Sequence, residues 1–153
     1  QQTLNLVNFI NKDEPEKICG GIGMQSHVDI KVPTIELYGT ALEKFLAAGY
    51  EVQITELDVT INYDTNGSYS YADEKETNAD QAKYVGQLMK TILEKNRSRD
   101  KNVNPKGVTG ITLWGLYDTI SWRASCSPLL FDTGITDPKA SFYEFINAAK
   151  SMG

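Results

Sequence analysis

The sequence predicts an α/β fold in which helices cover a parallel β-sheet. Short β-branched segments alternate with longer segments of helical periodicity, in the order helix, strand, helix, strand, helix, strand, helix. Alternation of this kind is typical of parallel sheets, because the crossover helices lie on the faces of the sheet. Three strands alone would leave bare parallel edges, which natural proteins seldom tolerate. The sequence therefore indicates part of a larger barrel or sheet.

The first half of the chain contains two predicted strands with a helix between them. Residues 4–10 form the end of an amphipathic helix, and residues 18–25 form the first strand. Pro33 suits the first turn of the next helix, which stops at Gly49. Residues 51–55 follow at once as the second strand. The helix between the strands is predicted from apolar residues at helical spacing, which are Ile35, Tyr38, Leu42, Phe45 and Leu46.

The second half contains one predicted strand between two helices. A polar loop over residues 62–72 precedes the longest helix, over residues 73–95. The third strand covers residues 108–114, and a long loop over residues 115–137 leads to a helix that Pro138 opens. The expected buried positions are Ala82, Val85, Met89 and Ile92 on the longest helix, and Phe142, Phe145, Ile146 and Ala149 on the last one.

Composition limits the class of protein. The 153 residues suffice for one ordinary domain, and a hydrophobic content of 41% fits a globular protein. The net charge of −5 and the pI of about 4.9 argue against nucleic acid and anionic membranes as partners. No apolar run is long enough to span a bilayer.

The two cysteines are expected to be free thiols. Cys19 precedes the first strand, whereas Cys126 lies in a loop beyond the opposite end of the sheet. A strand of about seven residues separates these levels by roughly 20 Å, which is beyond the reach of a disulfide. Neither cysteine has the spacing or the histidine partner of a metal site or a nucleophile.

Three predicted strand ends carry polar and aromatic side chains. Gln25 and His27 follow the first strand, Glu56 and Asp58 follow the second, and Trp114 ends the third. In parallel α/β folds, ligands and catalytic groups collect at the C-terminal ends of the strands. These side chains predict one polar site with aromatic walls, which suits a sugar. A lone glutamate at a strand end is more often a solvated or salt-bridged residue, so this interpretation depends on its neighbours.

Five motifs in order resemble the C-terminal part of a family-10 glycoside hydrolase, an endo-β-1,4-xylanase. They are residues 21–27 (GIGMQSH), 54–59 (ITELDV), 112–118 (TLWGLYD), 121–123 (SWR) and 128–132 (PLLFD). The resemblance implies an eight-stranded (β/α) TIM barrel, typically of about 250 residues. Residues 1–153 would then be the C-terminal half of the catalytic barrel, with strands six to eight and their helices. The Asn-Glu pair of strand four, whose glutamate is the general acid/base of the family, has no match here, so the acid/base is expected outside this chain.

The resemblance assigns catalytic roles to three residues. Retaining glycosidases use two carboxyl groups about 5–5.5 Å apart, of which one attacks the anomeric carbon. Glu56 matches this nucleophile, His27 matches a hydrogen-bond donor that orients it, and Asp58 matches the partner of the imidazole. Glu56 and Asp58 are two residues apart on a strand, so they point the same way and can reach one ring. His27 is the only histidine of the chain.

The resemblance also implies the residues that bind substrate. Trp114 and Trp122, the only tryptophans of the chain, match the walls of the subsite for the attacked sugar, because indole packs on sugar faces. Gln25 is placed to bond a sugar hydroxyl or a carboxylate. For Arg123, a position in the cleft and a position in a surface salt bridge are equally expected. The leaving-group side has weaker candidates, which are Tyr63, Tyr69 and Tyr71.

The implied function is hydrolysis of internal bonds of xylan by double displacement, with no cofactor and no metal. The expected partners are xylan or xylo-oligosaccharide and an N-terminal half-barrel segment of the same enzyme, without nucleic acid or membrane. The whole enzyme is expected to be secreted, because its polymeric substrate cannot enter a cell. Two alternatives stay open, a fragment or inactive relative that only binds glycan, and a half-barrel that pairs with itself.

Overall fold

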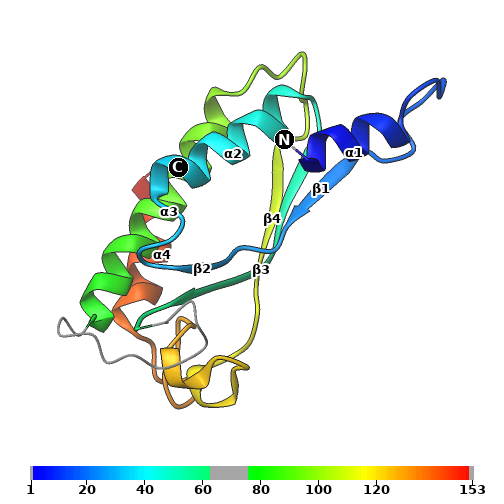
Figure 1. The fold of residues 1–153 in the computed structure, drawn as a ribbon. Helices are drawn as coiled ribbons and strands as arrows, with labels where there is room; N and C mark the ends of the chain where they lie inside the picture. The colour runs from blue at the N-terminus through cyan, green and yellow to red at the C-terminus, as the bar shows by residue number, and fades with distance from the viewer. Residues whose placement is uncertain (1, 63–75, 152–153) are drawn as a thin grey trace.

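The computed structural model describes residues 2–62 and 76–151 of the chain. Figure 1 shows how its helices and strands are arranged. The helices of the described part are α1 (Gln2–Ile10), α2 (Ile35–Ala47), α3 (Asn78–Ser98) and α4 (Ala140–Ser151), with short 3-10 helices η1 (Asp118–Ile120) and η2 (Ala124–Cys126). The strands are β1 (Gly21–Met24), β2 (His27–Asp29), β3 (Glu51–Thr60) and β4 (Val108–Leu113).

All strand pairs in the sheet are parallel, and β3 is the central strand. β1 and then β2 pair with one side of β3, while β4 pairs with the other side. Helices α2, α3 and α4 lie together on one face of the sheet (Figure 1). The predicted helix–strand alternation and the parallel sheet are therefore confirmed.

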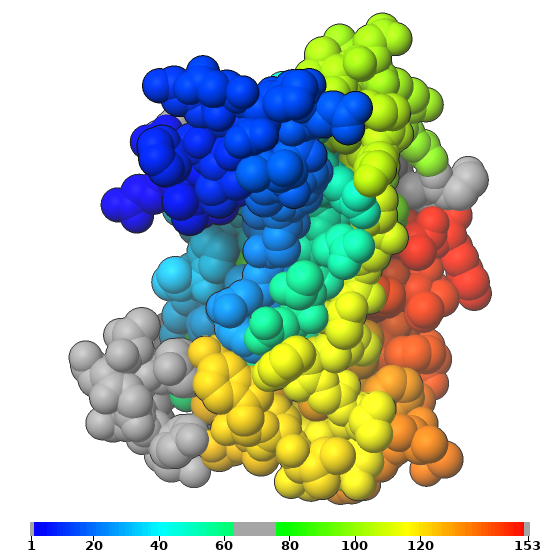
Figure 2. Space-filling model, turned by 90° about the vertical axis from the view of Figure 1, so that its right-hand side faces the viewer, coloured from blue at the N-terminus to red at the C-terminus, as the bar shows by residue number. Residues whose placement is uncertain are grey.

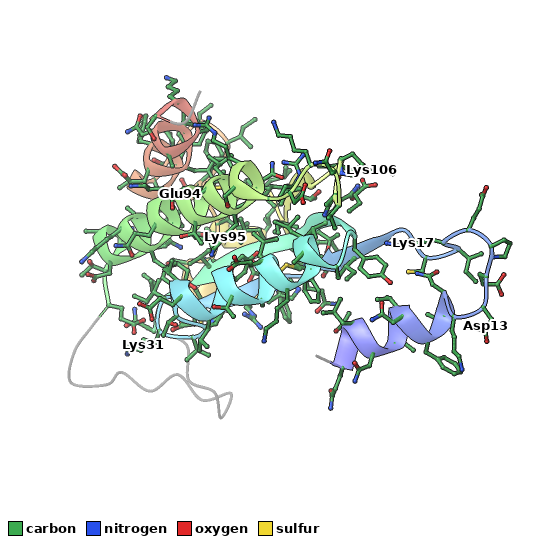
Figure 3. The ribbon with its side chains drawn as sticks, turned by 90° about the horizontal axis from the view of Figure 1, so that it is seen from above. Asp13, Lys17, Lys31, Glu94, Lys95 and Lys106 are labelled. Carbon is green, nitrogen blue, oxygen red and sulfur yellow. The ribbon has the colours of Figure 1, made fainter. Side chains whose placement is uncertain are left out.

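The opposite face of the sheet is open. Figure 2 shows residues of β1, β3 and β4 side by side at the surface, between α1 and the loop after β4. A hollow of about 360 Å³ lies on this face, lined by residues of β1 and β3 that include Gly23, Glu51 and Gln53. Lys106 binds Glu51 at 2.7 Å. Figure 3 marks the two ends of the sheet, with Lys106 just before β4 and Lys31 just after β2.

Two strand predictions need correction. The predicted first strand over residues 18–25 is shorter, and a second short strand, β2, follows it after a break. β3 continues to Thr60 instead of ending at Thr55, because its ladder passes from β1 to new partners. The Val59 amide donates to the Pro128 carbonyl at 2.9 Å. Glu56 therefore lies inside β3, although it is level with the C-terminal ends of β1 and β4.

Helix ends differ from the prediction where a cap or bridge decides the first turn. Thr34 caps α2, so Pro33 precedes the helix instead of opening it. Thr77 and Asp80 form a capping box, so α3 begins at Asn78 rather than at residue 73. Pro138 pairs with Phe131 in a β-bridge, which delays α4 to Ala140.

The core lies between the sheet and its helices. Leu42, Val52, Ile54, Leu88 and Ile92 are at most 1% exposed and pack in one cluster. The predicted stripe on α3 is confirmed, because all four of its residues are buried. On α4 the prediction is wrong for Ala149, which is exposed while Ala148 packs on the core. No helix within residues 2–62 and 76–151 combines the length and the apolar character needed to span a membrane.

A buried ion pair anchors the loop between β4 and α4. The Lys139 ammonium lies 2.8 Å from Asp118 and also donates to the Ser127 carbonyl at 2.8 Å. The other oxygen of Asp118 accepts the Leu129 amide at 2.7 Å. Burial raises the pKa of Asp118 and lowers the pKa of Lys139, because each charge loses hydration. Removal of either partner would therefore leave the other as a buried, unpaired charge.

We expect Lys139→Met to lower the free energy of unfolding by about 3–5 kcal/mol, because it leaves the Asp118 carboxylate buried and unpaired. The measurement is urea unfolding followed by circular dichroism. The control is the double variant Asp118→Asn/Lys139→Met, which removes both charges and keeps an acceptor for the Leu129 amide. It should recover part of the loss, and a double variant no more stable than the single one would contradict the prediction.

Candidate functional site

A one-residue shift in the pairing of β3 aims the two candidate carboxylates away from the helices. Met24 lies opposite Ile54, but His27 lies opposite Asp58, so β3 has one residue more than its neighbour in this interval. Before the shift, Ile54 points into the core, and after it Leu57 does. Without the extra residue, Glu56 would share the face of Ile54 and enter the apolar core. Because of the shift, Glu56 and Asp58 lie on the opposite face.

The break between β1 and β2 lies beside this shift. Gln25 and Ser26 fill the break, and Ser26 has a positive φ of 68°. The Glu56 amide donates to the Gln25 carbonyl at 3.0 Å, and the Asp58 amide donates to the Ser26 carbonyl at 3.3 Å. These bonds tie the break to the residues that carry the carboxylates.

The imidazole of His27 bridges both carboxylates. Its Nδ1 lies 3.0 Å from Oδ2 of Asp58, and its Nε2 lies 3.0 Å from Oε2 of Glu56. Side-chain exposure falls from 24% for Glu56 to 15% for His27 and 0% for Asp58. A carboxylate can only accept, so both contacts are hydrogen bonds at once only when the ring has two N–H groups or one carboxyl group holds a proton. Glu56 is thus the accessible end of a series of side-chain contacts that begins at the buried Asp58.

Residues of the loop after β4 complete the site. The Trp122 indole donates from Nε1 to Oδ2 of Asp58 at 2.8 Å, and its ring centroid is 4.9 Å from that of His27. The Trp114 ring is 6.1 Å from His27. Both indoles keep much of their surface free, with 46% exposure for Trp114 and 61% for Trp122. The site therefore has two aromatic faces beside an accessible carboxylate.

Arg123 supplies the positive charge nearest to Asp58. Its Nη1 is 3.6 Å from Oδ1 of Asp58, and its guanidinium lies 4.3 Å from the Trp122 ring centroid. Oδ1 is buried and has no hydrogen-bond partner among the described residues, so the electrostatic contact with Arg123 compensates it. Of the two positions left open for Arg123, the structure favours the inner one, where it stacks on an indole and faces a carboxylate.

The structure brings together most of the predicted site residues. Glu56, His27 and Asp58 are in direct contact, and Trp122 and Arg123 contact this group. Gln25 is exposed at the break beside them. Tyr63, Tyr69 and Tyr71 lie outside the described residues, so their assignment stays a prediction. Within the described part of the chain, no group of three or more His, Cys, Asp or Glu side chains is arranged to hold a metal ion.

Sequence reasoning does not single out the residues that support the site from behind. Ser26 faces the helix layer, where its hydroxyl is 2.7 Å from that of Tyr38. The buried pair of Asp118 and Lys139 fixes the loop that carries both tryptophans. A polar residue such as Ser26, at a position that the alternation of the neighbouring residues turns toward the core, is the one signal that could have pointed to the first of these contacts.

Comparison with known proteins agrees with this geometry. Bifunctional endo-1,4-beta-xylanase XylA of Ruminococcus flavefaciens is 36% identical over 149 residues, which are 97% of this chain and 13% of that protein. Endo-1,4-beta-xylanase A of Butyrivibrio fibrisolvens is 36% identical over 136 residues, which are 88% of this chain and 28% of that protein. A solved structure of a mutant xylanase A of P. fluorescens subsp. cellulosa, in complex with xylopentaose, matches with a TM-score of 0.73 and 28% identity. The match covers 96% of this chain and 45% of that one.

The chain thus spans less than half the length of these relatives. Its solved neighbours include TIM-barrel xylanases, and the chain covers 44% of the length of two of them, so the predicted partial (β/α) barrel is confirmed. Residues 1–148 match the sequence profile of glycosyl hydrolase family 10. The resemblance inferred from the five motifs is therefore confirmed, and the chain belongs to glycosyl hydrolase family 10.

Proposed function

We propose that residues 1–153 are the nucleophile-bearing, C-terminal half of the catalytic barrel of a retaining endo-1,4-β-xylanase. The observation that carries the proposal is the double contact of His27, 3.0 Å from both Glu56 and Asp58. A retaining mechanism needs an accessible carboxylate held in one orientation. Glu56 has this exposure, and His27 and Asp58 supply the orientation.

The proposed reaction is a double displacement. An oxygen of Glu56 forms a bond to the anomeric carbon while the bond from that carbon to the leaving oxygen breaks. The leaving oxygen takes a proton from an acid/base glutamate, which lies outside this chain. Water, deprotonated by the same glutamate, then breaks the glycosyl ester and releases Glu56. The imidazole of His27 orients Glu56 throughout, and the buried Asp58 orients the imidazole.

The substrate in this proposal is xylan or a xylo-oligosaccharide. Trp114 and Trp122 pack on sugar faces, and both indoles are exposed beside Glu56. Gln25 lies at the rim of the break and bonds a sugar hydroxyl, while Arg123 borders the same subsite. The matched structure from P. fluorescens subsp. cellulosa holds xylopentaose, which supports this choice of substrate class.

The proposed partner is an N-terminal half-barrel segment of the same enzyme. A groove of about 450 Å³ runs between β1 and α2, and its lining includes the apolar side chains of Ile22, Leu37 and Phe45. The β1 edge and the inner face of the sheet are open in the same region (Figure 2). Strands that close a barrel would cover both. Because xylan is a polymer outside cells, the assembled enzyme acts as a secreted protein.

Glycan binding without hydrolysis is the second candidate function. It is favoured by the large exposed area of Trp114 and Trp122. A glycan can pack on this area whether or not an N-terminal half supplies the second carboxyl group. A protein that only binds glycan does not need Glu56 to be held in one orientation. The two functions are therefore separated by the reactivity of Glu56.

The proposed function predicts covalent labelling of Glu56 by a 2-fluoro xylobioside with a dinitrophenyl leaving group. The dinitrophenolate departs without a proton, so this step needs only the nucleophile, and the fluorine slows hydrolysis of the adduct. We expect one adduct per chain by intact-protein mass, mapped to Glu56 by peptide fragmentation. Glu56→Gln should abolish the adduct, and turnover of xylan by the assembled enzyme should fall by about 10⁴-fold or more.

The labelling is done on the chain alone and with the N-terminal half-barrel added. An adduct in either sample supports the proposed function, and dependence on the added half supports the proposed partner. Absence of an adduct in both samples, together with measurable binding of xylopentaose, would identify the chain as a glycan-binding protein instead.

A further prediction separates the roles of the two indoles. Trp122→Phe keeps an aromatic face but removes the donor to Asp58, and a hydrogen bond to a charged group contributes about 1.5–3 kcal/mol. We expect the maximal labelling rate to fall by about tenfold or more, with little change in the reagent concentration at half-maximal rate. Trp114→Phe is the matched control, and it should change that concentration more than the rate. Equal effects of both variants on the rate would contradict the prediction.

A further inference from the structure

The break between β1 and β2 places a polar side chain where the strand pattern calls for an apolar one. Side chains alternate along this edge, so Ile22, Met24 and Val28 pack toward the helices. Ser26 shares that face, while Gln25 and His27 on either side of it point toward the candidate site. Figure 1 shows β1 and β2 as consecutive arrows joined by this short segment. Ser26 is thus the hinge between the two residues that the strand edge contributes to the site.

The backbone of Ser26 needs support in this position. Its φ of 68° is in the left-handed region, which costs free energy in any residue with a Cβ. Two interactions hold it, one from β1 and one from helix α2. The Ser26 hydroxyl donates to the Met24 carbonyl at 3.3 Å, and the same oxygen lies 2.7 Å from the Tyr38 hydroxyl.

The direction of this small relay follows from proton counting. Ser26 has one hydroxyl proton, which it donates to Met24, so it accepts from Tyr38. Tyr38 is only 4% exposed, and this burial raises its pKa to about 12, which keeps the phenol protonated. Helix α2 therefore supplies a fixed donor to the strand break through a single side chain.

We propose that Tyr38 and Ser26 are positioning residues, which act through the backbone of the break to hold the His27 imidazole between Glu56 and Asp58. The ring must place both nitrogens 3.0 Å from their partners at once, so a small rotation of the peptide between Ser26 and His27 lengthens one contact. The Ser26 carbonyl is bonded to the Asp58 amide, which joins the hinge to the same strand. The consequence for reaction rate rests on the proposed function, whereas the consequence for the ring does not.

The chain offers a matched control for the Tyr38 hydroxyl. Tyr84 on α3 is also a buried tyrosine, at 6% exposure, and its hydroxyl donates to the Pro33 carbonyl at 2.7 Å. Within the described residues, this hydroxyl bonds the loop before α2 and not the break between β1 and β2. Tyr38→Phe and Tyr84→Phe therefore each remove one buried hydroxyl with a backbone or side-chain partner, but only the first removes the relay.

The test uses the single histidine as a spectroscopic reporter. Because His27 is the only histidine, its two ring nitrogens give unambiguous signals in a long-range ¹H–¹⁵N spectrum of the ¹⁵N-enriched chain. We expect Tyr38→Phe to shift or broaden these signals, while Tyr84→Phe leaves them in place. In the labelling experiment, Tyr38→Phe should lower the maximal rate by roughly ten- to hundredfold, with the half-maximal concentration unchanged.

Ser26→Gly tests the relay from the other side. Glycine adopts the positive φ freely and lacks the hydroxyl, so strain is removed together with the acceptor. It should move the His27 signals as Tyr38→Phe does, and the double variant should be no worse than either single one. This variant also decides the question if Tyr38→Phe does not fold.

The proposal is overturned if the His27 signals are unchanged in both Tyr38→Phe and Ser26→Gly. It is also overturned if Tyr84→Phe shifts these signals as much as Tyr38→Phe does. A parent chain that shows the expected signals but is never labelled, even with the N-terminal half-barrel added, would contradict the proposed function and leave the positioning role supported. The two failures are therefore distinguishable.

Discussion

The polar end of this partial barrel depends on one buried carboxylate. Asp58 has no exposed side-chain surface. Its Oδ2 lies 3.0 Å from Nδ1 of His27 and accepts the Trp122 indole N–H, while Arg123 faces its second oxygen. A carboxylate without such donors would cost several kcal/mol to bury. Since the donors come from β2 and from the loop after β4, the charge is compensated only when these segments meet. The interaction that closes this end of the fold is therefore the same one that assembles the candidate site.

The two faces of the sheet differ in character, because one carries the apolar core and the other carries the candidate carboxylates. Val52, Ile54, Leu57 and Val59 of β3 pack toward the helices, and the one-residue shift between Ile54 and Leu57 keeps this true along the whole strand. The same shift turns Glu56 outward at the level where β1 and β4 end. A long strand with an extra residue between Ile54 and Leu57 thus provides an uninterrupted core on one side and an accessible carboxylate on the other.

The loop after β4 is held by an internal anchor. It carries both tryptophans, and a loop with large exposed aromatic groups needs an anchor to keep them in place. The anchor is the Asp118–Lys139 pair, which is buried, bonded to backbone groups on both sides, and adjacent to the start of α4. Rigid support behind exposed indoles is the arrangement that a sugar-binding cleft needs.

The amino-acid sequence alone was enough to predict the parallel α/β class, the family, the apolar stripe of α3 and the residue types of the site, because periodicity and ordered motifs are local properties. It could not determine that β3 continues past Glu56, since the partners of its second half are the loop around Pro128 and the short β2. Nor could it place Ser26 beside Tyr38, or Lys139 beside Asp118. Those contacts join segments that are distant along the chain, and only the packing of helices on the sheet decides which buried polar groups find partners.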